Sequence, residues 1–141
     1  MDQPRSRLPD LEQVGAFLKA LGLRFEVLEP ARVVGTMVLG PDHHTPWGVV
    51  HGGVYTTAIE SVASVGASLA VSERGQFAVG LNNTTDFLRP LQGGQVTVTA
   101  EAIHQGQTQQ LWQVSITRSD DKLVARGQVR LQNVELPRQA S

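Results

Sequence analysis

The longest regular pattern of apolar residues in the chain begins at a pair of glycines, Gly52 and Gly53. No proline occurs from there to Val71, and apolar side chains recur every three or four residues; they are Val54, Ala58, Val62, Val65 and Leu69. This spacing is that of one face of an α-helix. At about 1.5 Å per residue, a helix over 51–71 is roughly 30 Å long, comparable to the diameter of a small domain. The pattern therefore predicts one long central helix.

The patterns before this helix predict a short helix and a hairpin. Asp10 is a suitable N-cap for an amphipathic segment that ends at Gly22. Residues 23–28 then alternate between apolar and polar, and 31–39 form a second run that is rich in valine. The loop 40–48 contains two prolines and two glycines, so we expect it to deliver the chain to the start of the central helix.

After the central helix, four further runs alternate apolar and polar residues and are separated by turn residues. They are 77–88, 95–104, 109–118 and 123–131. Alternation gives a sheet one apolar and one largely polar face, and the short turns predict a meander. The apolar face needs a cover, and only the central helix is long enough to provide it. The sequence therefore predicts an α+β fold in which an antiparallel sheet wraps around one long helix.

The chain length of 141 residues is sufficient for one domain with a single core. We expect a flexible leader over 1–9, one folded domain over 10–134, and a flexible tail over 135–141, where the periodicity ends. The leader carries two prolines and two arginines but no apolar core, which argues against a secretory signal peptide.

Composition excludes several classes of protein. The formal net charge is −1, from 12 Lys and Arg against 13 Asp and Glu, so we expect neither nucleic acid nor an anionic membrane as a partner. The absence of cysteine excludes disulfides, a thiolate nucleophile and a Cys-ligated metal. Once the polar residues of the central helix are counted, no apolar run approaches the roughly 18 residues of a membrane span. We therefore expect a cytoplasmic protein.

Glu60 is the only charged residue between Val54 and Val71. On a helical wheel it lies in a row of small or hydroxyl-bearing side chains, which also contains Gly53, Thr56, Ser64 and Ala67. A glutamate on a helix is ordinarily a solvated surface residue. A helix that is apolar or small on nearly all sides, however, is buried on most of them. We therefore predict that Glu60 lies in a confined site.

Several segments resemble a known enzyme family. They are Gly48-Val49-Val50-His51-Gly52-Gly53 followed by Ala58-Ile59-Glu60-Ser61, then Asn82-Asn83-Thr84-Thr85-Asp86-Phe87-Leu88-Arg89-Pro90, and then Ala100-Glu101-Ala102-Ile103-His104-Gln105-Gly106. With the predicted order of elements, they are similar to hotdog-fold acyl-CoA thioesterases of the phenylacetate-pathway and 4-hydroxybenzoyl-CoA branch. The resemblance covers about residues 20–134.

The resemblance implies the hotdog fold, with homodimers that pair their sheets side by side and commonly join into homotetramers. It places the active sites at the protomer interface. It implies that Glu60 is the catalytic carboxylate and that the Gly52 N–H polarises the thioester carbonyl. It also implies that His51 is a nearby polar group and that Ser64 positions Glu60 or the attacking water. No cofactor is expected, because coenzyme A is part of the substrate.

The residues themselves support this chemistry. A helix that opens with glycines presents unpaired N–H groups and about half a positive charge, and Gly52 and Gly53 have no side chain to block a carbonyl. Glu60 is roughly 12 Å further along the helix, too far to act at the same carbonyl. Either the Glu comes from the other protomer, as the resemblance implies, or the chain before Gly52 leaves the helix axis. Glu60 then acts as a general base or as a nucleophile, and both roles remain open.

The chain departs from the family pattern at two positions. Many relatives have Gln six residues before the His, where this chain has Thr45, and many have Arg after His-x-Gly, where it has Gln107. We expect substrate contacts from Thr45, Trp47, Gly53, Asn83, Thr85 and Arg89. The arginines available for the CoA phosphates are Arg89, Arg118, Arg126 and Arg130, and the sequence does not rank them.

Several other polar and aromatic residues allow either a functional or a structural interpretation. His43 and His44 are neighbours on a proline-rich loop without a carboxylate at ligand spacing, so no metal site is predicted. Trp47 either stacks on the substrate or belongs to the core or an interface, and Trp112 is better placed in the core. The polar run 82–86 is either a solvent-facing edge or, as we favour, lines the acyl pocket or the dimer seam.

Two other functions compete with thioester hydrolysis. Hotdog domains also serve as non-catalytic acyl-CoA sensors, although nothing in this chain resembles a fused DNA-binding segment. A dehydratase or hydratase needs an Asp and a His placed for proton transfer to carbon, and only His51 and Asp86 are available. The acyl group is left open among hydroxybenzoyl, phenylacetyl, dihydroxynaphthoyl and medium-chain groups, and the resemblance favours aryl thioesters.

Overall fold

The computed structural model describes residues 9–137, so the segments 1–8 and 138–141, with most of the predicted leader and tail, lie outside the described residues. The elements are α1 (Ala16–Leu21), β1 (Arg24–Glu29), β2 (Arg32–Leu39), η1 (Pro41–His43), α2 (Gly52–Val71), η2 (Ser72–Arg74), β3 (Gln76–Phe87), β4 (Gly94–Gln105), β5 (Gln109–Arg118) and β6 (Leu123–Glu135). Strand β6 therefore includes Glu135, one residue into the segment predicted as a tail.

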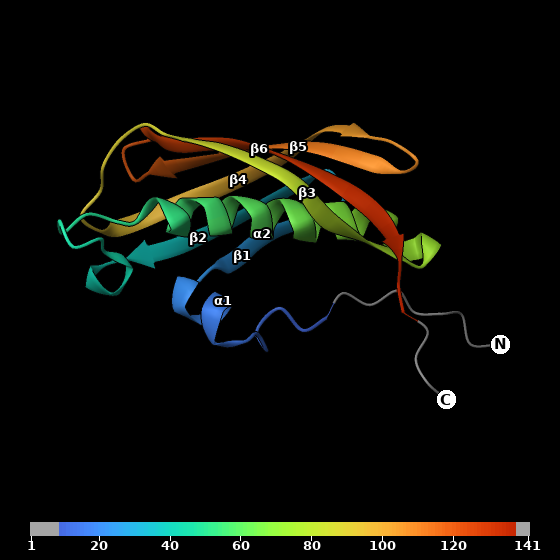
Figure 1. Cartoon of the computed structure of the whole chain (residues 1–141), viewed down its shortest axis with the longest axis horizontal. Helices are drawn as coiled ribbons and strands as arrows, with labels where there is room; N and C mark the ends of the chain where they lie inside the picture. The colour runs from blue at the N-terminus through green and yellow to red at the C-terminus, as the bar shows by residue number, and fades with distance from the viewer. Residues whose placement is uncertain (1–8, 138–141) are drawn as a thin grey trace.

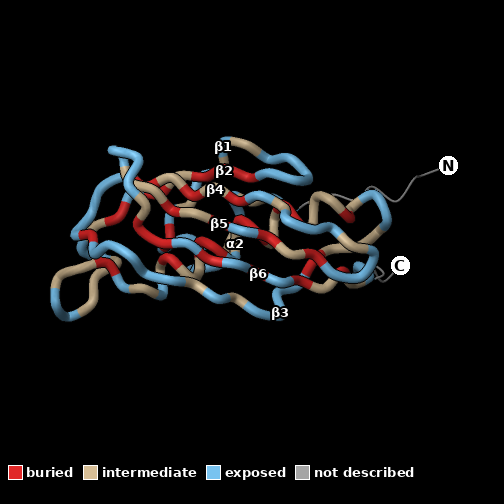
Figure 2. Tube along the Cα trace, turned by 90° about the horizontal axis from the view of Figure 1, so that it is seen from above, coloured by how far each residue is buried: buried red, intermediate tan, exposed pale blue. Residues whose placement is uncertain are grey.

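The six strands form one antiparallel sheet in the order β1-β2-β4-β5-β6-β3. The sheet curves around α2, which runs along its concave side (Figure 1). Seen from above, the strands cross the molecule in this order with α2 beneath them (Figure 2). This arrangement confirms the predicted α+β hotdog architecture, with an antiparallel sheet around one long helix.

The predicted meander is correct for β4, β5 and β6 but wrong for β3. Strand β3 pairs with β6, from Gln76 opposite Glu135 to Phe87 opposite Ala125, and β4 pairs with β2 instead. Alternation of apolar and polar residues determines which face of a strand is buried, but it does not determine which strand lies next to it. As a result, β3 and β1 are the two edge strands of the sheet.

The buried face of α2 is wider than the predicted stripe and is rotated from it. The buried residues are Tyr55, Ala58, Ile59, Val62, Ala63, Gly66, Ala67 and Val71. Because the sheet curls around the helix, it covers both sides of the Ala58–Val62 line. Val65, which the pattern assigned to the core stripe, is only half-buried and faces residues 11–21, the N-terminal segment, instead.

Helix α1 is shorter than predicted. The Asp10 carboxylate accepts a hydrogen bond from the Glu12 N–H at 3.0 Å, so it caps a turn, and the helix starts only at Ala16 after Gly15. The end is as predicted, because Gly22 adopts a left-handed conformation with φ 70° that suits glycine.

Trp112 of β5 forms the centre of the contact between sheet and helix. Its side chain is fully buried, as predicted, and its Nε1–H donates to the Gln110 amide oxygen at 2.9 Å. Gln110 in turn donates to the Ala67 carbonyl of α2 and to Asn133 of β6, both at 2.9 Å. This satisfied polar network ties the helix to two strands.

The segment Gly52–Arg74 is long and apolar enough, by length and composition alone, to cross a membrane. The expectation that no run reaches that threshold is therefore wrong. The core helix of a folded domain meets the same criterion, and 44% of the segment's apolar window is buried inside the domain.

We predict that Gly66→Ala destabilises the protein. A Cβ at Gly66 would lie 2.5 Å from the Trp112 ring and 2.9 Å from Val33, and both side chains are fully buried and cannot move aside. Overpacking of this kind costs about 1–3 kcal/mol, which exceeds the roughly 1 kcal/mol that alanine gains in helix propensity. Urea unfolding should show a lower midpoint for Gly66→Ala. The control is Gly40→Ala, because a Cβ at Gly40 meets nothing within 4 Å.

Candidate active site

The N-terminus of α2 leaves one backbone N–H without a partner. His51 is the N-cap, and its Nδ1 accepts a hydrogen bond from the Gly53 N–H at 2.8 Å. The Val54 N–H donates to the His51 carbonyl at 3.0 Å. The Gly52 N–H, first in the helix, has no hydrogen-bond partner within residues 9–137. The cap therefore singles out Gly52 as the free donor at the positive end of the helix.

This capping bond also determines the tautomer of the neutral His51 ring. Because Nδ1 accepts a hydrogen bond, the neutral ring carries its proton on Nε2. The same bond occupies the Gly53 N–H, which the sequence had offered to the substrate.

Phe87, at the end of β3, packs against the glycine at the start of α2. A Cβ on Gly52 would lie 2.8 Å from two atoms of the Phe87 ring, so glycine allows this close approach. The Phe87 ring also contacts Tyr55, with ring centroids 6.2 Å apart. The Tyr55 hydroxyl is buried and has no hydrogen-bond partner in the described part of the chain, and burial raises its pKa to about 12.

Glu60 lies two turns further along α2, beside the edge strand β3. A Cβ on Gly80 would be 3.5 Å from the Glu60 carboxyl carbon, so the carboxylate rests over the backbone of Gly80. The prediction that Glu60 lies in a confined site is wrong for a single chain, because its side chain is exposed. The reason is tertiary: β3 is an edge strand, and no further element among residues 9–137 covers the helix face beyond it.

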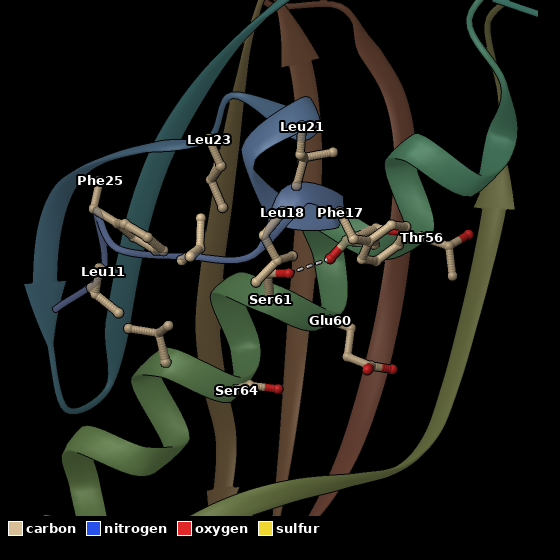
Figure 3. A pocket seen from close by; sticks show the side chains of 13 residues that line it. Leu11, Phe17, Leu18, Leu21, Leu23, Phe25, Thr56, Glu60, Ser61 and Ser64 are labelled. Atoms are coloured by element: carbon tan, nitrogen blue, oxygen red, sulfur yellow. Dashed lines mark hydrogen bonds between the residues drawn. The ribbon is translucent and has the colours of Figure 1, made fainter. Parts of the chain in front are cut away.

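A pocket of about 570 Å³ opens next to Glu60, between α2 and the N-terminal segment. Thr56, Glu60, Ser61 and Ser64 line it from α2 (Figure 3). Thr57 of the same helix also lines it. The opposite wall is apolar and includes Leu11, Val14, Phe17, Leu18, Leu23 and Phe25. Glu60 thus lies at the boundary between a large apolar pocket and the exposed edge of the sheet.

The polar residues of β3 hold the strand to the helix. The Asn83 amide donates to the Thr56 carbonyl of α2 at 3.0 Å, and the Thr85 hydroxyl donates to the Asn83 side-chain oxygen at 2.7 Å. Both side chains are half-buried between strand and helix and do not line the pocket beside Glu60.

The remaining predicted residues lie apart from this pocket. The Thr45 hydroxyl accepts a hydrogen bond from the Trp47 N–H within its own turn, and the Trp47 side chain is 85% exposed. Arg89 is exposed beyond the end of β3. Arg118 donates to Asp120 at 2.7 Å, and this bond lowers the Asp120 pKa to about 2, so Arg118 is already engaged.

The loop histidines have structural partners. His43 Nε2 donates to the Ala20 carbonyl of α1 at 2.8 Å while its Nδ1 accepts from the Gly40 N–H. His44 Nε2 hydrogen-bonds to the Gln92 carbonyl. Among residues 9–137, no three metal-ligating side chains come together.

Sequence reasoning missed the N-terminal segment as a wall of the site. The apolar face of 11–21 indicated only that this segment covers something apolar. Its position over Glu60 and Ser64 depends on how the hairpin of β1 and β2 folds back, which periodicity does not report. The sequence did not indicate Gly80 either. Gly80 matters because the Glu60 carboxylate rests over its backbone, and that contact arises only when β3 packs beside α2.

Comparison with known proteins gives a family and several close relatives. Residues 48–125 match the model of the Thioesterase superfamily. A protein of Mycobacterium tuberculosis with a provisional esterase name is 47% identical over 121 residues, which are 84% of this chain and 86% of that one. Its solved structure covers 86% of this chain and 98% of its own, with a TM-score of 0.83.

Two further relatives carry more specific names. A Listeria monocytogenes protein named 1,4-dihydroxy-2-naphthoyl-CoA hydrolase is 34% identical over 106 residues, covering 75% of this chain and 85% of its own. The structure of a Haemophilus influenzae thioesterase is 27% identical, with a TM-score of 0.83, and covers 99% of this chain and all of its own.

We predict that Tyr55→Phe stabilises the protein at neutral pH. The buried Tyr55 hydroxyl has no partner among the described residues, so its removal relieves a desolvation cost of about 1–3 kcal/mol. The wild type should also lose stability between pH 10 and about 12, because the unfolded state releases this proton before the folded state does. Urea unfolding of both proteins across pH 7–11 measures both effects. Equal stability at pH 7, or the same alkaline slope in the variant, would refute this account.

Proposed function

The chain belongs to the thioesterase superfamily, and on this premise we propose that it hydrolyses an acyl-CoA thioester to the free acid and coenzyme A. We further propose that it belongs to the phenylacetate-pathway and 4-hydroxybenzoyl-CoA branch and acts in the cytoplasm. The observation that carries the proposal is the unpartnered Gly52 N–H at the positive end of α2. No hydrogen bond within residues 9–137 occupies this donor, so it can donate to a carbonyl oxygen.

The Gly52 N–H would stabilise the negative charge that develops on the thioester oxygen as the carbonyl is attacked. One such donor is worth about 2.7–4 kcal/mol in a comparable acyl-transfer site. His51 has a supporting role here, because it takes up the neighbouring Gly53 N–H and anchors the first turn. Its exposed ring adds a polar group at the mouth of the site.

Glu60 would supply the attack on the thioester carbonyl, either by activating water or as the nucleophile. The carboxylate either removes a proton from the water that attacks the carbonyl, or attacks the carbonyl itself. In the second case the C–S bond breaks, coenzyme A leaves as the thiol, and water then hydrolyses the mixed anhydride to the free acid and Glu60. Ser64 is one turn further along the same row of α2 and half-buried, so it is within reach of Glu60 or of the water.

One chain does not bring these two groups together, because Gly52 and Glu60 are eight residues apart on one helix, roughly 12 Å along its axis. A homodimer paired through β3 solves this problem. Glu60 lies beside Gly80, and Gly52 lies beside Phe87. An antiparallel pairing with its two-fold axis near Asn83 would set Gly80 of one strand opposite the partner's Phe87. Each Glu60 would then approach the partner's Gly52.

The composition of β3 supports this pairing. An edge strand presents unpaired N–H and C=O groups, and three apolar side chains on β3 are exposed in the single chain. Their exposures are 37% for Val79, 51% for Leu81 and 57% for Phe87. Two such dimers would join into a homotetramer, as the sequence resemblance implies.

The substrate is proposed from the relative and from the pocket. The Listeria monocytogenes relative is named for an aryl-CoA thioester, and the pocket beside Glu60 is mostly apolar. We propose an aryl-CoA such as hydroxybenzoyl-, phenylacetyl- or dihydroxynaphthoyl-CoA. Arg89, Arg126 and Arg130 are exposed and available for the CoA phosphates, and Thr45, Trp47, Asn83 and Thr85 are proposed to act from positions along the dimer seam.

We predict that Glu60→Gln lowers kcat for thioester hydrolysis by about 10²–10⁴-fold, because the variant has no base or nucleophile. Release of free CoA thiol from a panel of aryl- and alkyl-CoA thioesters measures the effect. Glu73→Gln, an exposed glutamate on η2, is the matched control and should keep full activity. Substrate binding without turnover in the wild type would instead indicate an acyl-CoA sensor.

We also predict that Gly52→Pro lowers kcat by about 10²–10³-fold, because proline has no N–H to offer the carbonyl. Proline suits the first position of a helix, and His51 already has the extended conformation required before proline, with φ −66° and ψ 134°. The Phe87 ring would have to move, so Phe87→Ala is the control for that displacement.

Mixing the two inactive variants tests the shared site. If Gly52 and Glu60 come from different protomers, co-refolded Glu60→Gln and Gly52→Pro form heterodimers with one intact site, and about a quarter of all sites recover. No recovery, with heterodimers demonstrated by mass spectrometry, would place both groups in one protomer and refute the dimer arrangement.

A further inference from the structure

The pocket between α2 and the N-terminal segment has two walls of different chemistry. We propose, on the premise of the function proposed above, that the segment 11–21 is the specificity-determining wall of an acyl subsite. The geometry points to an uncharged ring system, larger than one ring, that presents an O–H or N–H donor to Thr57 and Ser61.

The position of the pocket connects it to the reaction. Glu60 and Ser64 stand at its rim, and the apolar side chains lie on the side away from β3 (Figure 3). A thioester carbonyl placed at Glu60 therefore directs its acyl group under α1. The segment is held there by the hydrogen bond from His43 to the Ala20 carbonyl and by the buried Leu21.

The apolar wall selects against charged acyl groups. Among the described residues that line the pocket there is no Lys, Arg or His, and Glu60 is the one charged group. A carboxylate on the acyl group would lose its hydration, gain no counter-charge and be repelled by Glu60. Dicarboxylic acyl groups such as succinyl are therefore expected to be poor substrates.

The volume of the pocket favours a large acyl group. A dry apolar cavity of roughly 150 Å³ is sufficient for benzene. The pocket beside Glu60 measures about 570 Å³, so a single ring leaves much of the apolar wall uncovered. A fused bicyclic ring contacts more of it and buries more apolar surface.

The hydroxyl groups of α2 determine which polar substituents fit. The Thr57 hydroxyl donates to the Gly53 carbonyl and the Ser61 hydroxyl donates to the Thr57 carbonyl, each at 2.7 Å (Figure 3, dashed line for Ser61). Their protons are already engaged in the helix, so only their lone pairs face the pocket. As long as these bonds within the helix are kept, the two groups accept a hydrogen bond and do not give one. A ring hydroxyl then satisfies them where a methoxy or nitro group does not.

The first test compares hydroxynaphthoyl-CoA with acetyl-CoA in the wild type and in Phe17→Ala and Leu18→Ala. Phe17 is 73% exposed and Leu18 38%, so both variants should fold. We expect the ratio of kcat/KM values, naphthoyl over acetyl, to fall about tenfold or more in at least Leu18→Ala. Leu28→Ala is the matched control, since Leu28 is an exposed leucine outside this pocket. An unchanged ratio in both pocket variants would overturn the proposal.

The second test compares hydroxynaphthoyl-CoA with naphthoyl-CoA in Ser61→Ala. We expect kcat/KM to fall about tenfold for the hydroxylated ester alone. Ser72→Ala, which removes a similar hydroxyl-to-carbonyl bond at the other end of the helix, is the control. An equal fall for both esters would show that Ser61 is merely structural and would overturn the role assigned to it.

Binding of a non-hydrolysable thioether analogue of hydroxynaphthoyl-CoA, measured by calorimetry with the same variants, separates this proposal from the proposed function. Binding that weakens in Leu18→Ala and Ser61→Ala without any thioester turnover would support the acyl subsite and refute hydrolysis. Turnover with binding that none of the pocket variants weakens would support hydrolysis and refute the subsite.

Discussion

The close contact between α2 and the concave face of the sheet fixes the positions of the other elements. Gly66 allows the helix to approach Trp112 and Val33 more closely than any side chain would permit. The network from Trp112 through Gln110 to the Ala67 carbonyl satisfies the polar groups buried by that contact. Because the helix is held this firmly, its exposed row and its N-terminus have defined positions relative to β3 and the N-terminal segment.

This contact also separates the two chemical groups of the site. The Gly52 N–H and the Glu60 carboxylate project from one rigid helix, so no local rearrangement brings them together. The same geometry places each of them beside a different point of the edge strand β3, Gly80 for the carboxylate and Phe87 for the N–H. A rigid helix behind an open sheet edge therefore favours a site that two copies of the chain complete together, which is the basis of the proposed homodimer.

The acyl side of the site has a different physical origin. The segment 11–21 is irregular over its first five residues and helical over the six residues of α1, and it covers the side of α2 that the sheet does not reach. Its apolar side chains face threonine and serine hydroxyls whose protons are used within the helix. One wall of the pocket therefore offers apolar contact, and the other accepts hydrogen bonds. The proposed specificity comes from this combination and not from any single residue.

The elements and the chemical groups they carry follow from local sequence patterns. Periodicity indicated the long helix and the faces of the strands, the glycines at 52 and 53 indicated the open helix N-terminus, and the lone charge at Glu60 marked the row that carries the proposed catalytic carboxylate. These are local properties, set by side chains that lie close together in the chain. Three features depend instead on the folded chain: β3 pairs with β6, Glu60 is exposed beside Gly80, and residues 11–21 form a wall of the pocket. Each of these depends on contacts between residues far apart in the chain, which alternation and spacing do not encode.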